Sequence, residues 1–216
     1  MKKVVVCTLS FVLCLLMSVS AFAIGDFTDV EEGKWYCEAV EYVYENGVMV
    51  GITDTEFGPN VATNRAMVVT VLARLAGADL SSYEQTDFVD VKVKSWYGKS
   101  VIWAKENGIV AGIDKTHFEP MTEITREQMC VMLSNFLDFM GLFTPNPEVE
   151  PFADIDQVSK WAVDDVVRLQ KADIVNGKEG NKFDPKGSAT RAEIAQIILS
   201  SRLADINSPQ ATALYE

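Results

Sequence analysis

The sequence has few of the residues that catalytic and metal sites most often use. Among 216 residues there is one histidine, His117, and it has no counterpart elsewhere in the chain. A histidine-based triad or a multi-histidine zinc site therefore cannot be assembled. The sequence also has no phosphate-binding glycine loop, dinucleotide fingerprint or serine elbow. A pair of carboxylates stays open in so acidic a chain, but the pattern favours a protein that is not an enzyme and needs no metal or cofactor.

Positive charge is also scarce. The chain has 19 Lys and Arg against 31 Asp and Glu, which gives a formal net charge of −12, and the basic residues form no stripe. A protein with this negative net charge repels DNA and RNA, so nucleic-acid binding is excluded as a function class. If the partner is nevertheless an anionic polymer, a few well-placed arginines must hold it.

The N-terminus is typical of a secretory signal peptide. Lys2 and Lys3 precede an apolar stretch over residues 4–19, and residues 21–23 read Ala-Phe-Ala, so we expect residues 1–23 to be cleaved before Ile24. An uncleaved membrane anchor is the alternative, although the segment is at the short limit for a span, which needs about 20 apolar residues. Cleavage changes the formal charge from −12 to −14 and leaves no membrane span, so we expect a secreted protein.

Only two cysteines remain after this cleavage, Cys37 and Cys130. They are too few to suggest a disulfide scaffold. Both lie within apolar helical stretches, where we expect buried thiols, and a bridge between them stays open.

A repeat of about 60 residues organises the rest of the chain. The copies start at Phe27, Phe88 and Phe152, which are 61 and 64 residues apart. Each copy contains an aspartate, a tryptophan, a glycine, a second phenylalanine and an arginine in the same order. These are Asp29, Asp90 and Asp154; Trp35, Trp96 and Trp161; Gly51, Gly112 and Gly177; Phe57, Phe118 and Phe183; and Arg65, Arg126 and Arg191. The spacing from glycine to phenylalanine is 6 and from phenylalanine to arginine 8 in all three copies, which chance does not produce.

Each copy predicts two amphipathic helices. The first follows the tryptophan and ends at Gly47 and Gly108, as a glycine cap ends a helix, whereas Asp173 in the third copy predicts a different ending. The second starts at the arginine and has apolar residues at i, i+3, i+4 and i+7. Thr125 with Gln128 and Thr190 with Glu193 spell capping boxes, while the first copy has Asn64 as cap but Met67 where the box needs Glu or Gln.

One such helix pair is too small to bury its own apolar stripes, so we expect the three pairs to share a core. The predicted fold is all-α, with three helix-loop-helix repeats forming one pseudo-threefold helical bundle, and we expect a monomer. The predicted repeats are 24–80, 85–143 and 149–203, with linkers at 76–87 and 141–151 and a C-terminal tail at 204–216.

The combination F-x-D, W, G-x-x-x-G, F-x-P and T-R-A-E resembles the S-layer homology module, over roughly residues 25 to 203. The last motif is intact at residues 190–193, reads T-R-E-Q at 125–128 and N-R-A-M at 64–67. The resemblance implies a noncovalent anchor that binds an anionic, often pyruvylated, secondary cell-wall polysaccharide in grooves between modules. It also implies a location in the cell wall or S-layer of a bacterium, typically Gram-positive. The alternative is a protein-interaction module that pairs with other surface proteins through acidic faces without binding glycan.

The repeated arginines are the first candidate ligands. A cation in the first turn of a helix opposes the helix dipole, so its presence in three copies suggests a role. A guanidinium matches a carboxylate in bidentate geometry, and free N–H groups at the helix start would add anion donors. In that case replacing Arg126 or Arg191 with alanine should leave the fold intact. The alternative is a scaffold role, in which the arginines pair with the F-x-D aspartates.

The repeated tryptophans and glycines complete the candidate site. Trp35, Trp96 and Trp161 are expected either to stack on sugar rings or to pack in the core or groove wall. Gly51, Gly112 and Gly177 are expected to supply a turn with positive φ, or to allow close approach of a ligand. The three aspartates are expected to cap a local turn or helix rather than bind ligand.

Overall fold

The computed structural model describes residues 27–142 and 147–201 of the chain. Within them lie six α-helices and one short 3-10 segment, and no β-strand, which confirms the all-α class. The helices are α1 (Cys37–Glu45), α2 (Arg65–Leu75), α3 (Gly98–Glu106), α4 (Arg126–Phe139), α5 (Val163–Lys171) and α6 (Arg191–Ser201), with η1 at Ile155–Gln157. The predicted signal peptide and the tail at 204–216 lie outside the described residues. No helix in the described ranges is long and apolar enough to cross a membrane.

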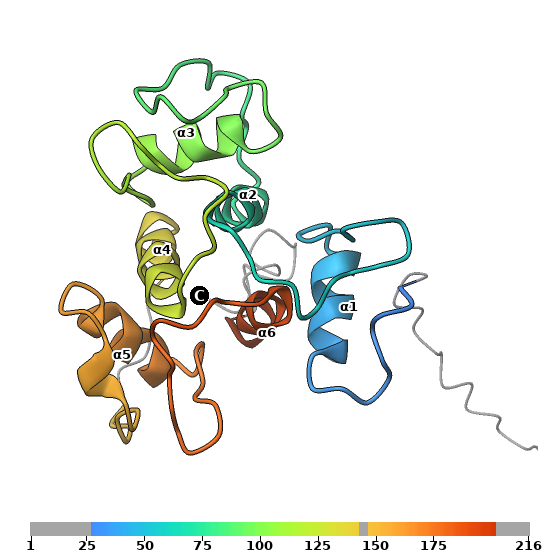
Figure 1. Cartoon of the computed structure of the whole chain (residues 1–216), viewed down its shortest axis with the longest axis vertical. Coiled ribbons are helices and arrows are strands. Elements are labelled where there is room, and N and C mark those ends of the chain that lie inside the picture. Colours follow the sequence, from blue (N-terminus) through green and yellow to red (C-terminus); the bar gives the residue numbers. More distant parts are fainter. Residues whose placement is uncertain (1–26, 143–146, 202–216) are drawn as a thin grey trace, which may run out of the picture.

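The second helix of every repeat lies at the centre of the molecule. Figure 1 shows α2, α4 and α6 around a common axis, with α1, α3 and α5 on the outside. A cavity of about 20 Å³ lies where the three inner helices meet. Its walls are Val68, Val71, Leu72 and Leu75 of α2, Met129 and Leu133 of α4, and Ile194, Ile197 and Ile198 of α6. The predicted apolar stripes of the second helices therefore form the shared core.

The outer helices pack across the repeat boundaries. Helix α3 contacts α2, α5 contacts α4, and α1 contacts α6. The first helix of each repeat is thus paired with the second helix of the preceding repeat, and the pairing of α1 with α6 closes the ring between the two ends of the chain (Figure 1). A repeat cannot bury its own outer helix, so each depends on its neighbour.

A ring of backbone hydrogen bonds joins the three repeats just before their inner helices. The N–H of Thr63 donates to the carbonyl of Ala189 at 2.8 Å, that of Ala189 to Ile124 at 3.1 Å, and that of Ile124 back to Thr63 at 2.9 Å. Each repeat donates one bond and accepts one. Removal of any repeat would break two of the three bonds.

The helix ends follow the predicted capping with one exception. Both capping boxes are formed, and the side chain of Asn64 accepts the Met67 N–H without a reciprocal bond. Gly47 and Gly108 have φ of 65° and 71°, as expected for the residue that ends a helix. The expectation that Asp173 ends its helix differently is wrong, because it adopts the same left-handed conformation, with φ of 56°. Aspartate is one of the few non-glycine residues that tolerate it.

The two cysteines are free thiols. Cys37 is half-buried on α1 and Cys130 is fully buried on α4. Burial raises the pKa of the Cys130 thiol to about 12, so it stays protonated and behaves as a small apolar side chain.

The shared core predicts a large effect for a single truncation at the axis. Leu133 of α4 is 4% exposed and lines the cavity where the three inner helices meet. We expect Leu133→Ala to lower the free energy of unfolding by ~2–5 kcal/mol while unfolding stays a single transition, measured by chemical denaturation. The control is Val89→Ala, at a side chain 73% exposed, which should change it by less than about 0.5 kcal/mol. Separate transitions for the repeats would contradict a common core.

Candidate functional site

The repeated arginines hold neighbouring repeats together. Arg65 donates from Nε to the carbonyl of Phe118 at 2.8 Å and from Nη2 to that of Ala111 at 3.1 Å, both in the second repeat. Arg126 makes the equivalent bonds to Phe183 and Asn176 of the third repeat, and Arg191 to Phe57 and Val50 of the first. Each guanidinium also lies over the phenylalanine ring of the same loop, 4.5 to 5.0 Å from its centroid. The three side chains are only 4–7% exposed.

The partners of these arginines differ from the expected aspartates. The Asp29 carboxylate accepts the N–H groups of Phe57 and Gly58 at 2.8 and 2.7 Å, and Asp90 and Asp154 do the same in their repeats. The aspartates cap a turn, as expected, but that turn begins 28 or 29 residues further along the chain. Burial opposes ionisation of Asp90 and Asp154, yet these backbone donors outweigh it and hold the pKa of both carboxyls below the ordinary value.

The N–H groups at the start of the inner helices are occupied by the protein itself. Those of Arg65 and Ala66 donate to the carbonyls of Thr122 and Pro120 at 3.1 and 2.9 Å, and the same pattern recurs at the starts of α4 and α6. The expectation that these groups serve as donors to an anionic ligand is therefore wrong. Carbonyl groups in the loop of the next repeat already accept these N–H groups.

The repeated tryptophans are exposed. Trp35, Trp96 and Trp161 are 60%, 59% and 58% exposed, so of the alternatives stated for them, packing in the core is wrong. Each outer helix begins two residues later, and Tyr36 and Tyr97, buried beside the first two tryptophans, take the core position. Each indole is held near the N-terminus of its outer helix and presents a broad apolar face to solvent.

The repeated glycines are needed for space and not for positive φ. Gly51, Gly112 and Gly177 are absent from the residues with positive φ, so that expectation is wrong. A Cβ on Gly112 would lie 2.3 Å from the carbonyl oxygen of Asp114 and 2.6 Å from the Phe88 ring, and Gly51 is enclosed in the same way. Gly177 is less crowded, because the nearest atom, Oδ1 of Asn181, lies 3.0 Å away. The atoms that approach these glycines closely therefore belong to the protein itself, mainly to the loop that follows each glycine.

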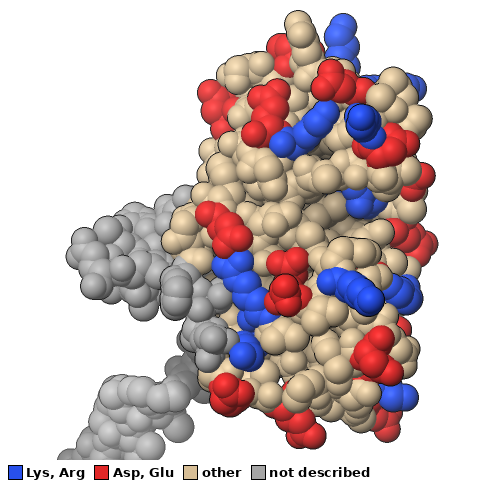
Figure 2. Space-filling view, turned by 90° about the vertical axis from the view of Figure 1, so that its left-hand side faces the viewer, with Lys and Arg blue, Asp and Glu red and all other residues tan. Residues whose placement is uncertain are grey.

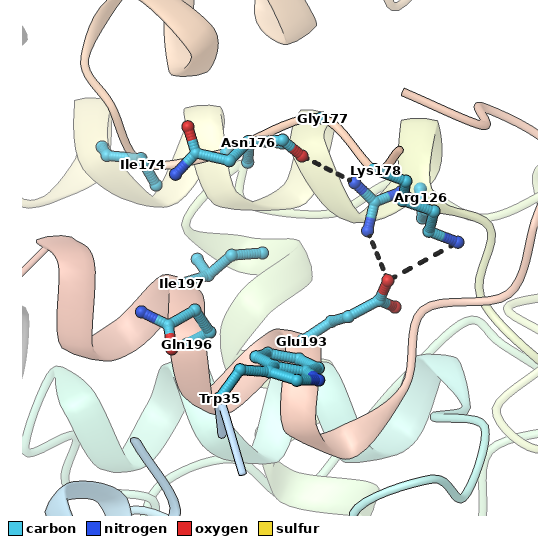
Figure 3. A pocket seen from close by; sticks show the side chains of 10 residues that line it. Trp35, Arg126, Ile174, Asn176, Gly177, Lys178, Glu193, Gln196 and Ile197 are labelled. Carbon is cyan, nitrogen blue, oxygen red and sulfur yellow. Dashed lines mark hydrogen bonds and ion pairs between the residues drawn. The ribbon is translucent and has the colours of Figure 1, made fainter. Parts of the chain in front are cut away.

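A groove of about 420 Å³ lies where all three repeats meet (Figure 3). Trp35 of the first repeat forms one wall, and Arg126 of the second lies at its end. The third repeat supplies the rest, namely Ile174, Val175, Asn176, Gly177 and Lys178 from one loop and Glu193, Gln196 and Ile197 from α6. Three of the predicted site residues, Trp35, Arg126 and Gly177, are thus brought together by the closure of the ring.

The charges in this groove are balanced. Oε1 of Glu193 accepts Nη1 of Arg126 at 2.8 Å and lies 3.6 Å from Nζ of Lys178, which also pairs with Asp184 at 2.9 Å. The other carboxylate oxygen of Glu193 completes the capping box of α6. In Figure 3 the Arg126–Glu193 pair lies beside the Trp35 indole, so the groove offers donors, acceptors and an aromatic face together.

Several residues of this groove were not among the predicted site residues, namely Lys178, Asn176 and Gln196 among others. Lys178 follows the repeated glycine, where the other copies have Ile52 and Ile113, and this difference was a readable signal. Gln196 and Asn176 carry no repeat signature of their own. Elsewhere, acidic and basic side chains are interspersed over the face seen in Figure 2.

Comparison with known proteins matches this repeat architecture to one family. A family model described as the S-layer homology domain matches residues 26–66, 87–130 and 151–195. Similar proteins include an amylopullulanase of Thermoanaerobacterium thermosulfurigenes, 33% identical over 80% of this chain and 9% of that protein, and the exoglucanase XynX of Acetivibrio thermocellus, 31% identical over 80% and 16%. An S-layer protein of Bacillus licheniformis is 27% identical over 91% of this chain and 22% of its own length. The chain thus spans less than a quarter of these relatives.

The packing around the repeated glycines predicts unequal effects of one substitution. Gly112→Ala places a methyl group against the Asp114 carbonyl and the Phe88 ring, so we expect it to lower the free energy of unfolding by ~1–3 kcal/mol. Gly177→Ala, whose nearest neighbour is a side-chain oxygen, should cost less than about 1 kcal/mol. Thermal and chemical denaturation of the two variants measure this. Equal losses would contradict the difference in crowding.

The burial of the arginines predicts that replacing one of them lowers the free energy of unfolding. This differs from the expectation from the sequence, that such a replacement leaves the fold intact. Arg65→Ala removes two charge-assisted bonds to carbonyls of the next repeat, each worth ~1.5–3 kcal/mol, so we expect a loss of about 3 kcal/mol or more. Arg65→Lys should restore little, because a lysine cannot donate to both carbonyls in the same fork. Chemical denaturation tests both variants. A change below about 0.5 kcal/mol in Arg65→Ala would show that the guanidinium does not join the repeats.

Proposed function

Because the chain belongs to the S-layer homology family, we propose that it is a noncovalent anchor that binds an anionic cell-wall polysaccharide in the grooves between its repeats. Modules of this family occur in S-layer proteins and attach proteins to the cell surface. The proposed location is the wall or S-layer of a Gram-positive bacterium, after export by the N-terminal signal segment. The proposed ligand and its site go beyond the family assignment and depend on the groove residues.

The observation that carries this proposal is the exposure of the three tryptophans. A soluble protein gains nothing from leaving a large aromatic side chain about 60% exposed at the same place in three copies. Trp35 lines a groove, and an indole face is suited to stack on the C–H face of a sugar ring. Stacking of this kind requires a fixed and exposed ring, which the junction between repeats provides.

The polar residues of the groove fit a sugar as well. Asn176, Lys178 and Gln196 can donate to hydroxyl oxygens, and Glu193 can accept from hydroxyl groups. They surround an opening of about 420 Å³, in the size range of small-molecule sites. The predicted ligands Trp35, Arg126 and Gly177 belong to this opening, whereas Arg65 and Arg191 with Trp96, Trp161, Gly51 and Gly112 belong to the equivalent positions at the other two junctions.

We also propose that the described repeats perform no catalysis. The relatives named as an amylopullulanase and an exoglucanase are far longer than the match, and the similarity covers 9% and 16% of them. The module itself is a non-catalytic anchor in the family. A binding role with no cofactor is therefore the most economical function for residues 27–201.

Wall binding by tryptophan variants tests the proposal. Trp35→Ala and Trp96→Ala should each weaken binding to Gram-positive wall sacculi by roughly ten- to hundredfold, since a buried aromatic contact is worth ~1.5–3 kcal/mol. The melting temperature should barely change, because both side chains are exposed. Val89→Ala, an exposed apolar residue outside the repeated pattern, is the matched control.

The same assay separates the glycan from a protein partner. Chemical removal of the non-peptidoglycan polymer from the sacculi should abolish binding of the native chain. Retained binding to stripped walls, or a requirement for another surface protein, would favour the protein-interaction function instead.

A further inference from the structure

Three Asn-Gly sequences occur in the chain, at residues 46–47, 107–108 and 176–177. In such a sequence the backbone nitrogen of the glycine can attack the side-chain carbonyl carbon of the asparagine, because glycine has no Cβ that hinders the approach. The attack closes a succinimide ring within the chain, so it needs no enzyme. The surroundings of each pair therefore determine whether its asparagine loses the amide group.

The first pair is held in an unreactive arrangement at the end of α1. Nδ2 of Asn46 donates to the carbonyl of Tyr42 at 2.8 Å, and the N–H of Gly47 donates to the carbonyl of Tyr44 at 2.9 Å. The leaving amide and the attacking nitrogen are thus both hydrogen-bonded. The ψ of Asn46 is 4°, so the glycine nitrogen is eclipsed with the nitrogen of Asn46 and lies away from its side chain.

The second pair, at the end of α3, is held in the same way. Nδ2 of Asn107 donates to the carbonyl of Trp103 at 2.8 Å and lies 3.4 Å from the hydroxyl oxygen of Tyr83. The N–H of Gly108 donates to the carbonyl of Lys105 at 3.1 Å, and the ψ of Asn107 is 10°. Either of these two pairs must break hydrogen bonds and rotate its backbone before it can react.

The third pair lies in a loop. Asn176 and Gly177 line the groove of about 420 Å³, at the position that residues 50–51 and 111–112 have in the other repeats (Figure 3). Both residues are exposed. In the part of the chain that the structure describes, the Asn176 amide makes no hydrogen bond and the Gly177 N–H has no acceptor. The leaving group and the attacking nitrogen are both free.

The loop is fixed by its backbone, which leaves the Asn176 side chain unrestrained. The carbonyl of Asn176 accepts Nη2 of Arg126 at 3.2 Å, and the N–H of Lys178 donates to the carbonyl of Lys182 at 2.7 Å. In Figure 3 the amide group of Asn176 points away from Arg126. The scaffold contacts of this loop therefore do not protect the amide.

We propose that Asn176 is a site of spontaneous deamidation, which replaces a neutral amide with a carboxylate in the groove. The nitrogen of Gly177 bonds to Cγ of Asn176, the bond from Cγ to Nδ2 breaks, and ammonia leaves with the proton that the glycine nitrogen gives up. Water then opens the succinimide at either of its two carbonyl carbons. The net reaction consumes one water and yields ammonia and either aspartate or isoaspartate.

The isoaspartate product also changes the contact with Arg126. When water attacks the former backbone carbonyl carbon of Asn176, the chain continues through Cγ. The oxygen that accepted Nη2 of Arg126 then belongs to a free carboxylate. Because Glu193 already pairs with Arg126, either product adds a negative charge to a balanced groove.

The other two junctions cannot follow this route. The carbonyls that accept the equivalent arginine bonds belong to Ala111 and Val50, whose side chains carry no amide. One junction of the three thus changes its charge as the protein ages.

The three pairs serve as controls for one another in a single sample. The folded chain is incubated at mildly alkaline pH and digested, and deamidation at each asparagine is measured by mass spectrometry of its peptide. We expect Asn176 to react about tenfold faster or more than Asn46 and Asn107, because each of these must first lose two hydrogen bonds. In the chain unfolded by denaturant the three rates should converge, because the reacting sequence is the same.

A substitution of the attacking residue identifies the chemistry. Gly177→Ala adds a methyl group that hinders the attack, so it should slow the reaction at Asn176 and leave the rates at Asn46 and Asn107 unchanged. Equal rates at the three asparagines of the folded chain, a slower rate at Asn176, or a rate there that Gly177→Ala does not reduce would overturn the proposal.

The effect of the new charge on binding rests on the proposed function and has its own readout. Asn176→Asp reproduces one of the two products. We expect it to weaken binding to wall sacculi by roughly three- to tenfold, as one added like charge near an anion does in partly screened surroundings. Equal binding of this variant and the native chain would overturn that effect, whereas a native chain that binds no sacculi would contradict the proposed function and leave the mass measurement valid.

Discussion

The structure depends on a buried guanidinium that reaches from each repeat into the loop of the next. Arg65, Arg126 and Arg191 each donate to two carbonyls of a neighbouring repeat and cover its phenylalanine ring. The N–H groups beside each arginine bond the same loop, so the start of every inner helix is completed by another repeat. Since the third repeat bonds the first, the set is closed, and no repeat has a complete hydrogen-bond inventory alone.

This closure also creates the candidate binding surface. The groove forms because Trp35 of the first repeat, Arg126 of the second, and the loop and inner helix of the third converge there. The arginines mainly serve the scaffold, so in the proposed site the ligand contacts fall to the exposed indole and to the polar residues of the groove.

Local signals in the sequence predicted local structure well. The stripes of the inner helices, the boxes at Thr125 and Thr190 and the caps at Gly47 and Gly108 all depend on residues within one or two helical turns, and all were confirmed. The errors concern long-range contacts. Gly112 is small because Phe88 and the Asp114 carbonyl crowd it, and Trp35 is exposed because Tyr36 takes the core position. The repetition of these residues indicated that they matter, but it did not indicate which residues they contact.

The sequence by itself determined the all-α class, the threefold repetition and the starts of the inner helices, because each follows from periodicity and fixed spacing along the chain. The family followed from the resemblance of the repeated motifs. Only the tertiary structure decided which helix packs on which, and hence that α1 pairs with α6. It also decided that Glu193 of the third repeat forms an ion pair with Arg126 of the second. The physical reason is that such contacts are long-range, since the arginine hydrogen bonds between repeats alone join residues 46 to 141 positions apart, and a ring of similar repeats allows several pairings that only packing distinguishes.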